Sequence, residues 1–287
     1  MSAFNILLYI VIGLASISMV KYFIYMFSTP LYILKQAKFL KASKGMSKEA
    51  IENRLKVSVI VPAWNEEVGI RTSILSLLSN SYDNLEIIVV NDGSTDKTDQ
   101  VIRTFIEKHF KPEIFGTKTL KYIDKKENGG KGSAINAGIK KSSGDLIITM
   151  DADTTFERDA ILNMARYFVD PTLEAAVGNV KVSNTKTMIG LLQQIEYTMG
   201  FYFKRTHAFF GSEYIIGGAF GAFRRSVFNR FGYFDEVNKT EDIEFSTRLQ
   251  YNGCTIMFAE DAIAYTEGAS TLKGLFKQRL RWKKGSV

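Results

Sequence analysis

The sequence has one cysteine and two histidines, so it contains no internal disulfide and offers no set of sulfur and imidazole ligands for zinc. Its four prolines and 22 glycines, without a Gly-X-Y period, exclude collagen-like and proline-rich chains. Acidic residues are outnumbered, 30 against 37 basic ones, and the net charge of +7 favours nucleic acid or an anionic membrane as a partner. The rest of the composition, 46% apolar and 23% charged over 287 residues, is typical of a globular protein with one or two domains.

Residues 3–27 are almost continuously apolar and predict a transmembrane helix, which needs about 20 such residues. Lys21 lies near the end of this run, where its side chain can reach the membrane interface beside Tyr22 and Tyr25. A cleaved signal peptide and a buried core helix are the alternatives. A signal peptide normally carries positive charge before its apolar run, and Met1 is followed there only by a serine.

A basic juxtamembrane linker is predicted over residues 28–55. Lys35, Lys38, Lys41 and Lys44 follow Pro30 in it, and no acidic residue occurs before Glu49. By the positive-inside rule this places the rest of the chain in the cytoplasm, at the inner membrane of the cell. The basic excess is then explained by the lipid bilayer, and nucleic acid is not expected as a partner.

Residues 56–270 predict one cytoplasmic α/β domain with a mostly parallel central sheet flanked by helices. Apolar residues with helical spacing separate short β-branched runs, which are the expected strands: 56–62, 85–90, 120–123, 146–150 and 175–182. In such sheets ligands bind beyond the carboxyl ends of the strands, so the loops that follow the strands are the candidate sites.

Three of these loops carry polar residues that are ambiguous when taken singly. The segments 62–67 (PAWNEE) and 91–96 (NDGSTD) are equally typical of ordinary turns and helix caps. The glycine-rich segment 127–133 departs from a phosphate-binding Walker A loop because Gly132, rather than serine or threonine, follows Lys131. A glycine-rich turn that opens a helix can still hold phosphate.

Asp151 and Asp153 follow the fourth expected strand. Residues i and i+2 of an extended chain point to the same side, so the two carboxylates are expected to lie together and to repel each other. A hard divalent cation relieves that repulsion, and Mg²⁺ typically takes one or two carboxylates plus substrate phosphates. A solvated acidic turn is the alternative.

Thr240-Glu241-Asp242 opens a helical pattern, where the alternative to a catalytic role is a helix cap with acids that complement the helix dipole. Residues 271–287 predict an amphipathic helix resting on anionic lipid, with Gln278-Arg279-Leu280-Arg281-Trp282 inside it. Its apolar face is expected to consist of Leu272, Leu275, Phe276 and Leu280.

Together, Asp92, Asp151-x-Asp153, Thr240-Glu241-Asp242 and Gln278-x-x-Arg281-Trp282 occur in the order and spacing of a known family. The chain resembles the membrane-embedded, processive, inverting glycosyltransferases of family 2, which include cellulose, chitin, hyaluronan and bacterial poly-N-acetylglucosamine synthases. The resemblance covers residues 57–285 and implies a GT-A fold that binds a UDP-sugar.

The resemblance also implies roles for single residues. Asp242 would be the general base, with Glu241 beside it, and Asp153 would hold Mg²⁺ or Mn²⁺ on the donor diphosphate with help from Asp151. The residues that would contact the donor or the acceptor terminus are Ala63, Glu66, Asp92, Lys131, Gln278, Arg281 and Trp282.

These roles fit the chemistry of glycosyl transfer. The departing diphosphate is an anion, which a metal, Lys131 and Arg281 would stabilise, and a sugar hydroxyl needs a carboxylate to take its proton. A single displacement converts an α-linked donor into a β-linked product, and the flat ring of Trp282 offers a surface for a sugar.

The stretches 190–197, 222–227 and 272–282 look closest to the synthases that polymerise N-acetylglucosamine. Hyaluronan-type and cellulose-type products are alternatives, as is the transfer of one sugar to a lipid phosphate. A nucleotide-binding or membrane-anchored interaction protein without catalysis is the alternative from another class. A dehydrogenase is disfavoured because no G-x-G-x-x-G follows the first expected strand.

Synthases of this group normally continue past the tryptophan motif into further transmembrane helices that form the polymer channel. One amino-terminal helix cannot enclose a polar glycan in lipid. We therefore expect this sequence to be a piece of a longer protein with weak or absent processivity, or to act with an oligomeric or accessory membrane subunit.

Overall fold

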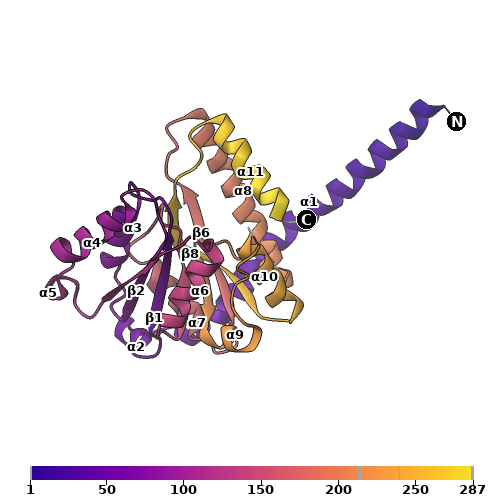
Figure 1. Ribbon diagram of the computed structural model, residues 1–287. Helices are drawn as coiled ribbons and strands as arrows, with labels where there is room; N and C mark the ends of the chain where they lie inside the picture. Colours follow the sequence, from indigo (N-terminus) through magenta and orange to yellow (C-terminus); the bar gives the residue numbers. More distant parts are fainter. Residues whose placement is uncertain (1, 213–214, 239, 286–287) are drawn as a thin grey trace.

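The computed structural model describes residues 2–212, 215–238 and 240–285, and it consists of a long N-terminal helix joined to a layered α/β domain (Figure 1). At the centre of the domain lies an eight-stranded sheet with the order β3-β2-β1-β4-β7-β6-β8-β5. Its strands are β1 (Val57–Ala63), β2 (Leu85–Asp92), β3 (Thr119–Lys125), β4 (Leu146–Thr149), β5 (Thr154–Phe156), β6 (Ala175–Val182), β7 (Gly221–Arg224) and β8 (Ile256–Thr266).

Strands β3, β2, β1 and β4 are neighbours and run parallel. Strand β7 is antiparallel to both β4 and β6, β6 is parallel to β8, and the short β5 is antiparallel to β8. Every residue of β1, β2 and β4 is buried, as expected for central parallel strands covered on both faces. The prediction of a mostly parallel α/β sheet is therefore confirmed.

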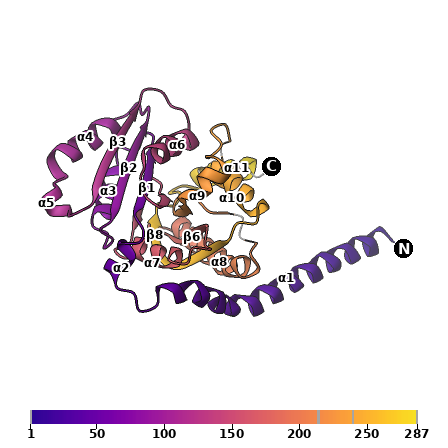
Figure 2. The same ribbon diagram turned by 90° about the horizontal axis from the view of Figure 1, so that it is seen from below.

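Helices cover both faces of this sheet. Figure 2 shows α3 and α4 on one face of the β1–β3 region and α6 on the other. Helix α7 packs on β8, and α8 packs on β6 and β8. The helices after the first are α2 (Lys48–Glu52), α3 (Ile70–Leu78), α4 (Thr98–His109), α5 (Pro112–Phe115), α6 (Lys131–Lys141), α7 (Ala160–Phe168), α8 (Met188–Phe210), α9 (Arg225–Phe231), α10 (Glu241–Tyr251) and α11 (Leu272–Gly285).

Helix α1 (Ala3–Leu40) is longer than the membrane segment predicted at 3–27. In the described part of the chain it is the one helix long and apolar enough to cross a membrane, with a mean hydropathy of 2.0 in its most apolar window. That window is unburied, and the first half of the helix projects away from the domain (Figure 1).

The second half of α1 is packed against the domain, so the stretch 28–55 that the sequence predicts as a linker is ordered structure. Ser28 and Thr29 are buried beside Thr206 of α8, each within 3.0 Å of its hydroxyl. The Tyr32 hydroxyl donates to the carbonyl oxygen of Phe258 in β8. After a short 3-10 turn (Lys41–Ser43), helix α2 adds further buried residues.

Candidate active site

The carboxyl ends of the parallel strands bring the predicted loops to one edge of the sheet. Ala63 is the last residue of β1, Asp92 is the last of β2, and Asp151 follows β4 after one intervening residue. Because β2, β1 and β4 are adjacent and parallel, these positions lie next to one another. Ala63 is buried, so it can offer a ligand only its backbone and a methyl group.

Asp92 holds the glycine-rich loop that leads to Lys131. Its carboxylate accepts hydrogen bonds from the Lys125 ammonium and, at 3.1 Å, from the Gly129 backbone N–H. The Asn128 side-chain amide donates to the Asp92 carbonyl oxygen at 3.1 Å. Asp92 is 2% exposed, and these hydrogen bonds show that it holds the loop in place.

Lys131 begins α6 and joins two acidic segments that are far apart in sequence. Its ammonium lies 2.5 Å from the Asp151 carboxylate and 3.6 Å from that of Glu241. Burial alone would lower the pKa of Lys131, but the carboxylates of Asp151, Glu241 and Asp242 together raise it above its ordinary value. Lys131 is therefore a fixed positive charge in this cluster.

The carboxylates around Lys131 carry more negative charge than it neutralises. Burial, and then the charge of Asp151, raise the pKa of Asp153, although hydrogen bonds from Thr266 and Thr154 oppose this. Burial and the charges of Asp153 and Asp151 raise the pKa of Glu66 to about 7. The loops that follow β1, β2 and β4 thus meet at one strongly acidic place.

Helix α10 adds Glu241 and Asp242 to this cluster from the other side. Glu241 is 4% exposed; burial raises its pKa, which Lys131 opposes and Asp242 reinforces. One oxygen of Asp242 accepts from the backbone N–H of Gly218 at 3.1 Å and the other from Ile243 at 2.9 Å.

Gly218 lies between Asp242 of α10 and the pair formed by Lys131 and Asp151. A Cβ at this position would be 2.5 Å from the Lys131 ammonium and 3.7 Å from the Asp151 carboxylate. The same residue donates to Asp242, so Asp242, Lys131 and Asp151 surround one short piece of backbone. Lys131 and Gly218 thus bring the Asp151-x-Asp153 and Thr240-Glu241-Asp242 segments close together.

Helix α11 carries the Gln278-x-x-Arg281-Trp282 motif and lies beside α8 (Figure 1). Arg279 forms a 2.5 Å ion pair with Glu196 of α8 and lies 4.2 Å from the centre of the Trp282 ring. The side chain of Arg281 lies outside the described residues. Among the described atoms, the Gln278 side-chain oxygen and one terminal nitrogen of Arg279 are buried without a hydrogen-bond partner.

Sequence reasoning missed the residues that connect α11 to the carboxylates. Burial raises the pKa of Tyr197 in α8; the charge of Arg279 opposes this, while those of Glu196, Asp151 and Asp153 add to it. Tyr197 therefore lies within electrostatic reach of both α11 and the acidic cluster. The proximity of 190–197 to 272–282 in space was not readable from their spacing, although both stretches were singled out.

The apolar side chains predicted for a membrane face of α11 are largely exposed. Leu272, Phe276 and Leu280 are exposed by 71%, 72% and 45%, respectively. The amphipathic character of α11 and its contact with lipid both stay predictions.

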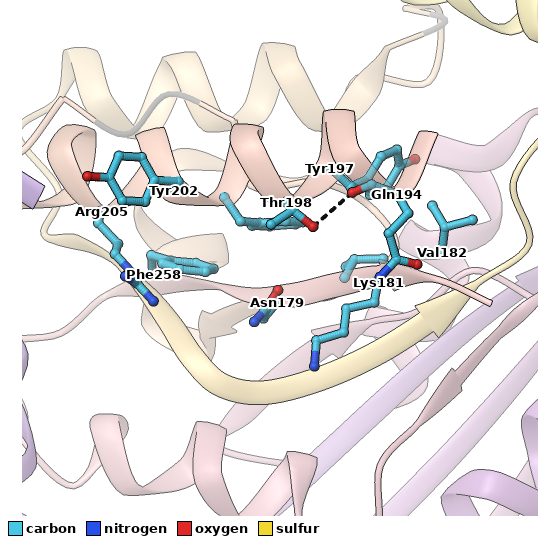
Figure 3. Close-up of a pocket in the computed structure, with 11 residues that line it drawn as sticks. Asn179, Lys181, Val182, Gln194, Tyr197, Thr198, Tyr202, Arg205 and Phe258 are labelled. Atoms are coloured by element: carbon cyan, nitrogen blue, oxygen red, sulfur yellow. Dashed lines mark hydrogen bonds between the residues drawn. The ribbon is translucent and has the colours of Figure 1, made fainter. Parts of the chain in front are cut away.

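A separate cavity of about 190 Å³ lies between α8 and the strands β6 and β8 (Figure 3). Figure 3 shows aromatic rings of Tyr202 and Phe258 on its walls, together with the long side chain of Lys181. None of the described residues predicted for the site lines this cavity, so the candidate site is the acidic cluster at the strand ends.

The carboxylate oxygens of the site suit a hard cation that substrate phosphates help to hold. Nowhere in the described ranges do three or more histidine, cysteine, aspartate or glutamate side chains form a ready metal cage. Asp151 and Asp153 supply carboxylate oxygens, and burial, followed by the charge of Asp151, raises the pKa of Asp153. This fits Mg²⁺ or Mn²⁺ completed by phosphate oxygens and does not fit a site built by protein ligands alone.

Comparison with known proteins gives a family and close relatives. The model of glycosyl transferase family 2 matches residues 58–232. The chain is 34% identical over 232 residues to a poly-beta-1,6-N-acetyl-D-glucosamine synthase of Staphylococcus epidermidis, which covers 80% of this chain and 54% of the relative. The Staphylococcus aureus protein of the same name gives 34% over 231 residues with the same shares. The chain thus spans about half the length of these curated relatives.

Solved structures agree on the fold. The mannosyltransferase PcManGT of Pyrobaculum calidifontis, in complex with GDP-Man and Mn²⁺, matches with a TM-score of 0.65 at 21% identity, over 90% of this chain and 73% of that one. Staphylococcus aureus TarS 1-349, in complex with UDP-GlcNAc, matches with a TM-score of 0.55 at 22% identity, over 76% of this chain and 60% of that one. The expected GT-A fold is confirmed.

Proposed function

The chain belongs to glycosyl transferase family 2, and we propose that it is an inverting, metal-dependent enzyme that transfers N-acetylglucosamine from its UDP donor onto a growing β-linked polysaccharide. The observation that carries the proposal is the meeting of Lys131, Asp151 and Asp242 around Gly218. The choice of sugar is supported by the staphylococcal relatives, which are named for a polymer of N-acetylglucosamine.

In this proposal the donor lies across the strand ends. Ala63, Glu66 and Asp92 contact the uridine, and the loop that Asp92 holds carries Lys131 towards the diphosphate. Asp153 and Asp151 would hold Mg²⁺ or Mn²⁺, and the bound cation would supply positive charge to the diphosphate of the leaving group. Lys131 is already placed by Asp151 and Glu241, so its charge can stabilise the departing UDP without reorganisation.

The acceptor hydroxyl attacks the anomeric carbon from the side opposite UDP. Its oxygen forms the new glycosidic bond while the bond from the anomeric carbon to the diphosphate breaks, and its proton passes to the Asp242 carboxylate. The backbone N–H groups of Gly218 and Ile243 fix the orientation of that carboxylate. Glu241 supports the step by holding Lys131 from the helix that also carries Asp242.

The end of the acceptor glycan is proposed to lie against α11. The buried Gln278 oxygen, which has no hydrogen-bond partner among the described side chains, is suited to a sugar hydroxyl, and the face of Trp282 that Arg279 does not cover is suited to a sugar ring. Arg281 is proposed to act near the diphosphate, as the family resemblance implies.

We further propose that α1 spans the inner membrane and that the catalytic domain is cytoplasmic, with α11 at the lipid surface. The lysines of residues 35–44 support this orientation. Extension of a polymer across the membrane would then involve other transmembrane segments or an accessory membrane subunit.

The test is to supply the membrane-bound protein separately with UDP-N-acetylglucosamine, UDP-glucose, UDP-glucuronate and GDP-mannose, each with and without Mg²⁺ or Mn²⁺. UDP release is expected to be fastest with UDP-N-acetylglucosamine, to require the metal, and to accompany a β-linked oligosaccharide. Faster release from GDP-mannose, or a product that is one sugar on a lipid phosphate, would overturn the proposal.

A further inference from the structure

The segment that connects the acidic cluster to α11 is held by two side-chain amides. Asn184 donates to the Gly268 carbonyl oxygen at 2.7 Å and accepts from the Gly268 N–H at 2.8 Å. Gln193 repeats this with Ala269, donating at 2.9 Å and accepting at 3.0 Å. Two consecutive residues of the connection are therefore paired in the manner of a strand, although their partners are side chains.

These two amides belong to one support built by the start of α8. Asn184 lies in the loop before α8, and a Cβ at Gly190 would lie 1.9 Å from the Asn184 carbonyl oxygen, so the loop rests directly on the first turn of the helix. Gln193 is 1% exposed, and its amide also donates to the Ile189 carbonyl oxygen at 3.1 Å. The support is thus rigid on the α8 side.

The connection is also fitted tightly on its own side. A Cβ at Gly268 would lie 3.0 Å from the Gln193 amide nitrogen and 3.1 Å from the Asn184 side-chain oxygen. Just before it, Thr266 ends β8 with its hydroxyl 3.3 Å from the Asp153 carboxylate. A clamp at residues 268–269 therefore fixes how the chain leaves the metal-binding carboxylate and enters the helix with the Gln278-x-x-Arg281-Trp282 motif.

The same face of α8 contacts α11 directly. Gln193, Glu196 and Tyr197 are spaced i, i+3 and i+4, so they share one side of the helix. Glu196 pairs with Arg279 at an exposed position, where an ion pair contributes little. The four hydrogen bonds of the clamp therefore tie the chain just before α11 to the start of α8.

We propose that Asn184 and Gln193 are positioning residues, which hold α11 in register with the donor site so that the acceptor terminus meets the anomeric carbon. This rests on the proposed transferase function. They bind neither substrate; they act through the backbone of Gly268 and Ala269. A reacting atom displaced by about 1 Å can slow a reaction about 100-fold, so a small shift of α11 is sufficient to matter.

The test uses Gln193→Met, which keeps the volume and helix propensity of the side chain but removes both of its bonds to Ala269, together with Asn184→Ala. Gln194→Met, the same change at the next position of α8, is the matched control. Each full-length, membrane-bound variant is measured for kcat of sugar transfer, for donor KM, for UDP affinity and for amide hydrogen exchange in the peptide covering residues 267–280.

We expect kcat to fall between about 10-fold and 100-fold in both clamp variants, while donor KM and UDP affinity stay within about threefold of wild type. Exchange of the 267–280 peptide should become faster in these variants and stay unchanged in Gln194→Met. A purely structural role would instead lower the amount of UDP-binding protein and the transfer rate in equal proportion, and that result would overturn the proposal.

Three other outcomes separate this inference from the function on which it rests. Faster exchange with unchanged kcat would refute the positioning role and leave the transferase function intact. A wild-type protein that transfers no sugar would refute the function, and unchanged exchange in the clamp variants would refute the clamp on its own.

Discussion

Replacing Asp242 by asparagine removes the proposed general base with little change of shape. The asparagine oxygen can still accept from one of the two backbone N–H groups, of Gly218 or Ile243, that Asp242 now binds. A general base contributes about 10²- to 10⁴-fold to a reaction rate, which corresponds to roughly 3 to 5 kcal/mol of activation free energy. We therefore expect transfer to fall by that factor while UDP affinity stays within about threefold, because the uridine and diphosphate contacts are on other residues.

A matched control is present two residues further along the same helix. Glu244 is paired with Arg248 by contacts of 2.8 and 2.5 Å, and this i,i+4 pair is worth about 0.3 to 0.5 kcal/mol. Glu244→Gln removes the same charge from α10 without touching the cluster. Transfer measured as UDP release, beside calorimetric UDP titration, should separate the two variants. If Asp242→Asn kept transfer within about tenfold of wild type, or Glu244→Gln lost as much, Asp242 would not be the base.

Three further predictions concern the acidic cluster. Asp153→Ala should abolish the metal-dependent part of UDP binding in a titration with and without chelator, and unchanged metal dependence would remove Asp153 from the site. Gly218→Ala should displace the flexible end of Lys131 from Asp151, slowing transfer about tenfold or more with little change in melting temperature. Because the folded-state pKa of Glu66 is raised to about 7 from its ordinary value of 4.5, the wild-type protein loses stability as pH rises through that window. Glu66→Gln should therefore have the same stability as the wild-type protein near pH 4. At pH 8 without metal it should be more stable by up to about 2 kcal/mol of unfolding free energy and melt at a higher temperature, and equal melting temperatures at pH 8 would contradict this.

Much of the fold follows from local patterns in the sequence. The run at 57–63 and its counterparts at 85–92 and 146–149 are apolar and β-branched because they are buried on both faces of the sheet, so their identity as central strands is readable. The short strands β5 and β7 are not readable in this way. They have three and four residues, and they are strands only because β8 and β4 are beside them.

The packed second half of α1 is a further limit of sequence reasoning. Ser28 and Thr29 interrupt the apolar run and are typical of the end of a membrane segment. They are nonetheless buried between α1 and α8, because their hydroxyls contact that of Thr206, a residue at least 177 positions away in sequence. Such a distant partner leaves no local signal.

Only part of the candidate site can likewise be predicted from the sequence. The sequence predicts Asp151 and Asp153 on one side of an extended chain, but the structure places them in a turn that is closed by a 3.0 Å bond from the Thr154 N–H to the Asp151 carbonyl oxygen. Their meeting with Glu241 depends on Lys131 and on the bare backbone of Gly218, which are brought in by two other loops. Arg279, Glu196 and Tyr197 were not readable as a link because their roles depend on how α8 and α11 lie side by side.

The union of α1 with the domain has a mechanical consequence. Lys35 donates to the Ala208 carbonyl oxygen at 2.5 Å and Gln36 to the Tyr167 hydroxyl at 2.6 Å, one turn beyond the bond from Tyr32 to β8. The second half of the helix is thus fixed to the domain by several side-chain hydrogen bonds and is not a flexible linker. If α1 is embedded in lipid, a tilt imposed by a thicker or thinner bilayer would turn the α/β domain together with the helix.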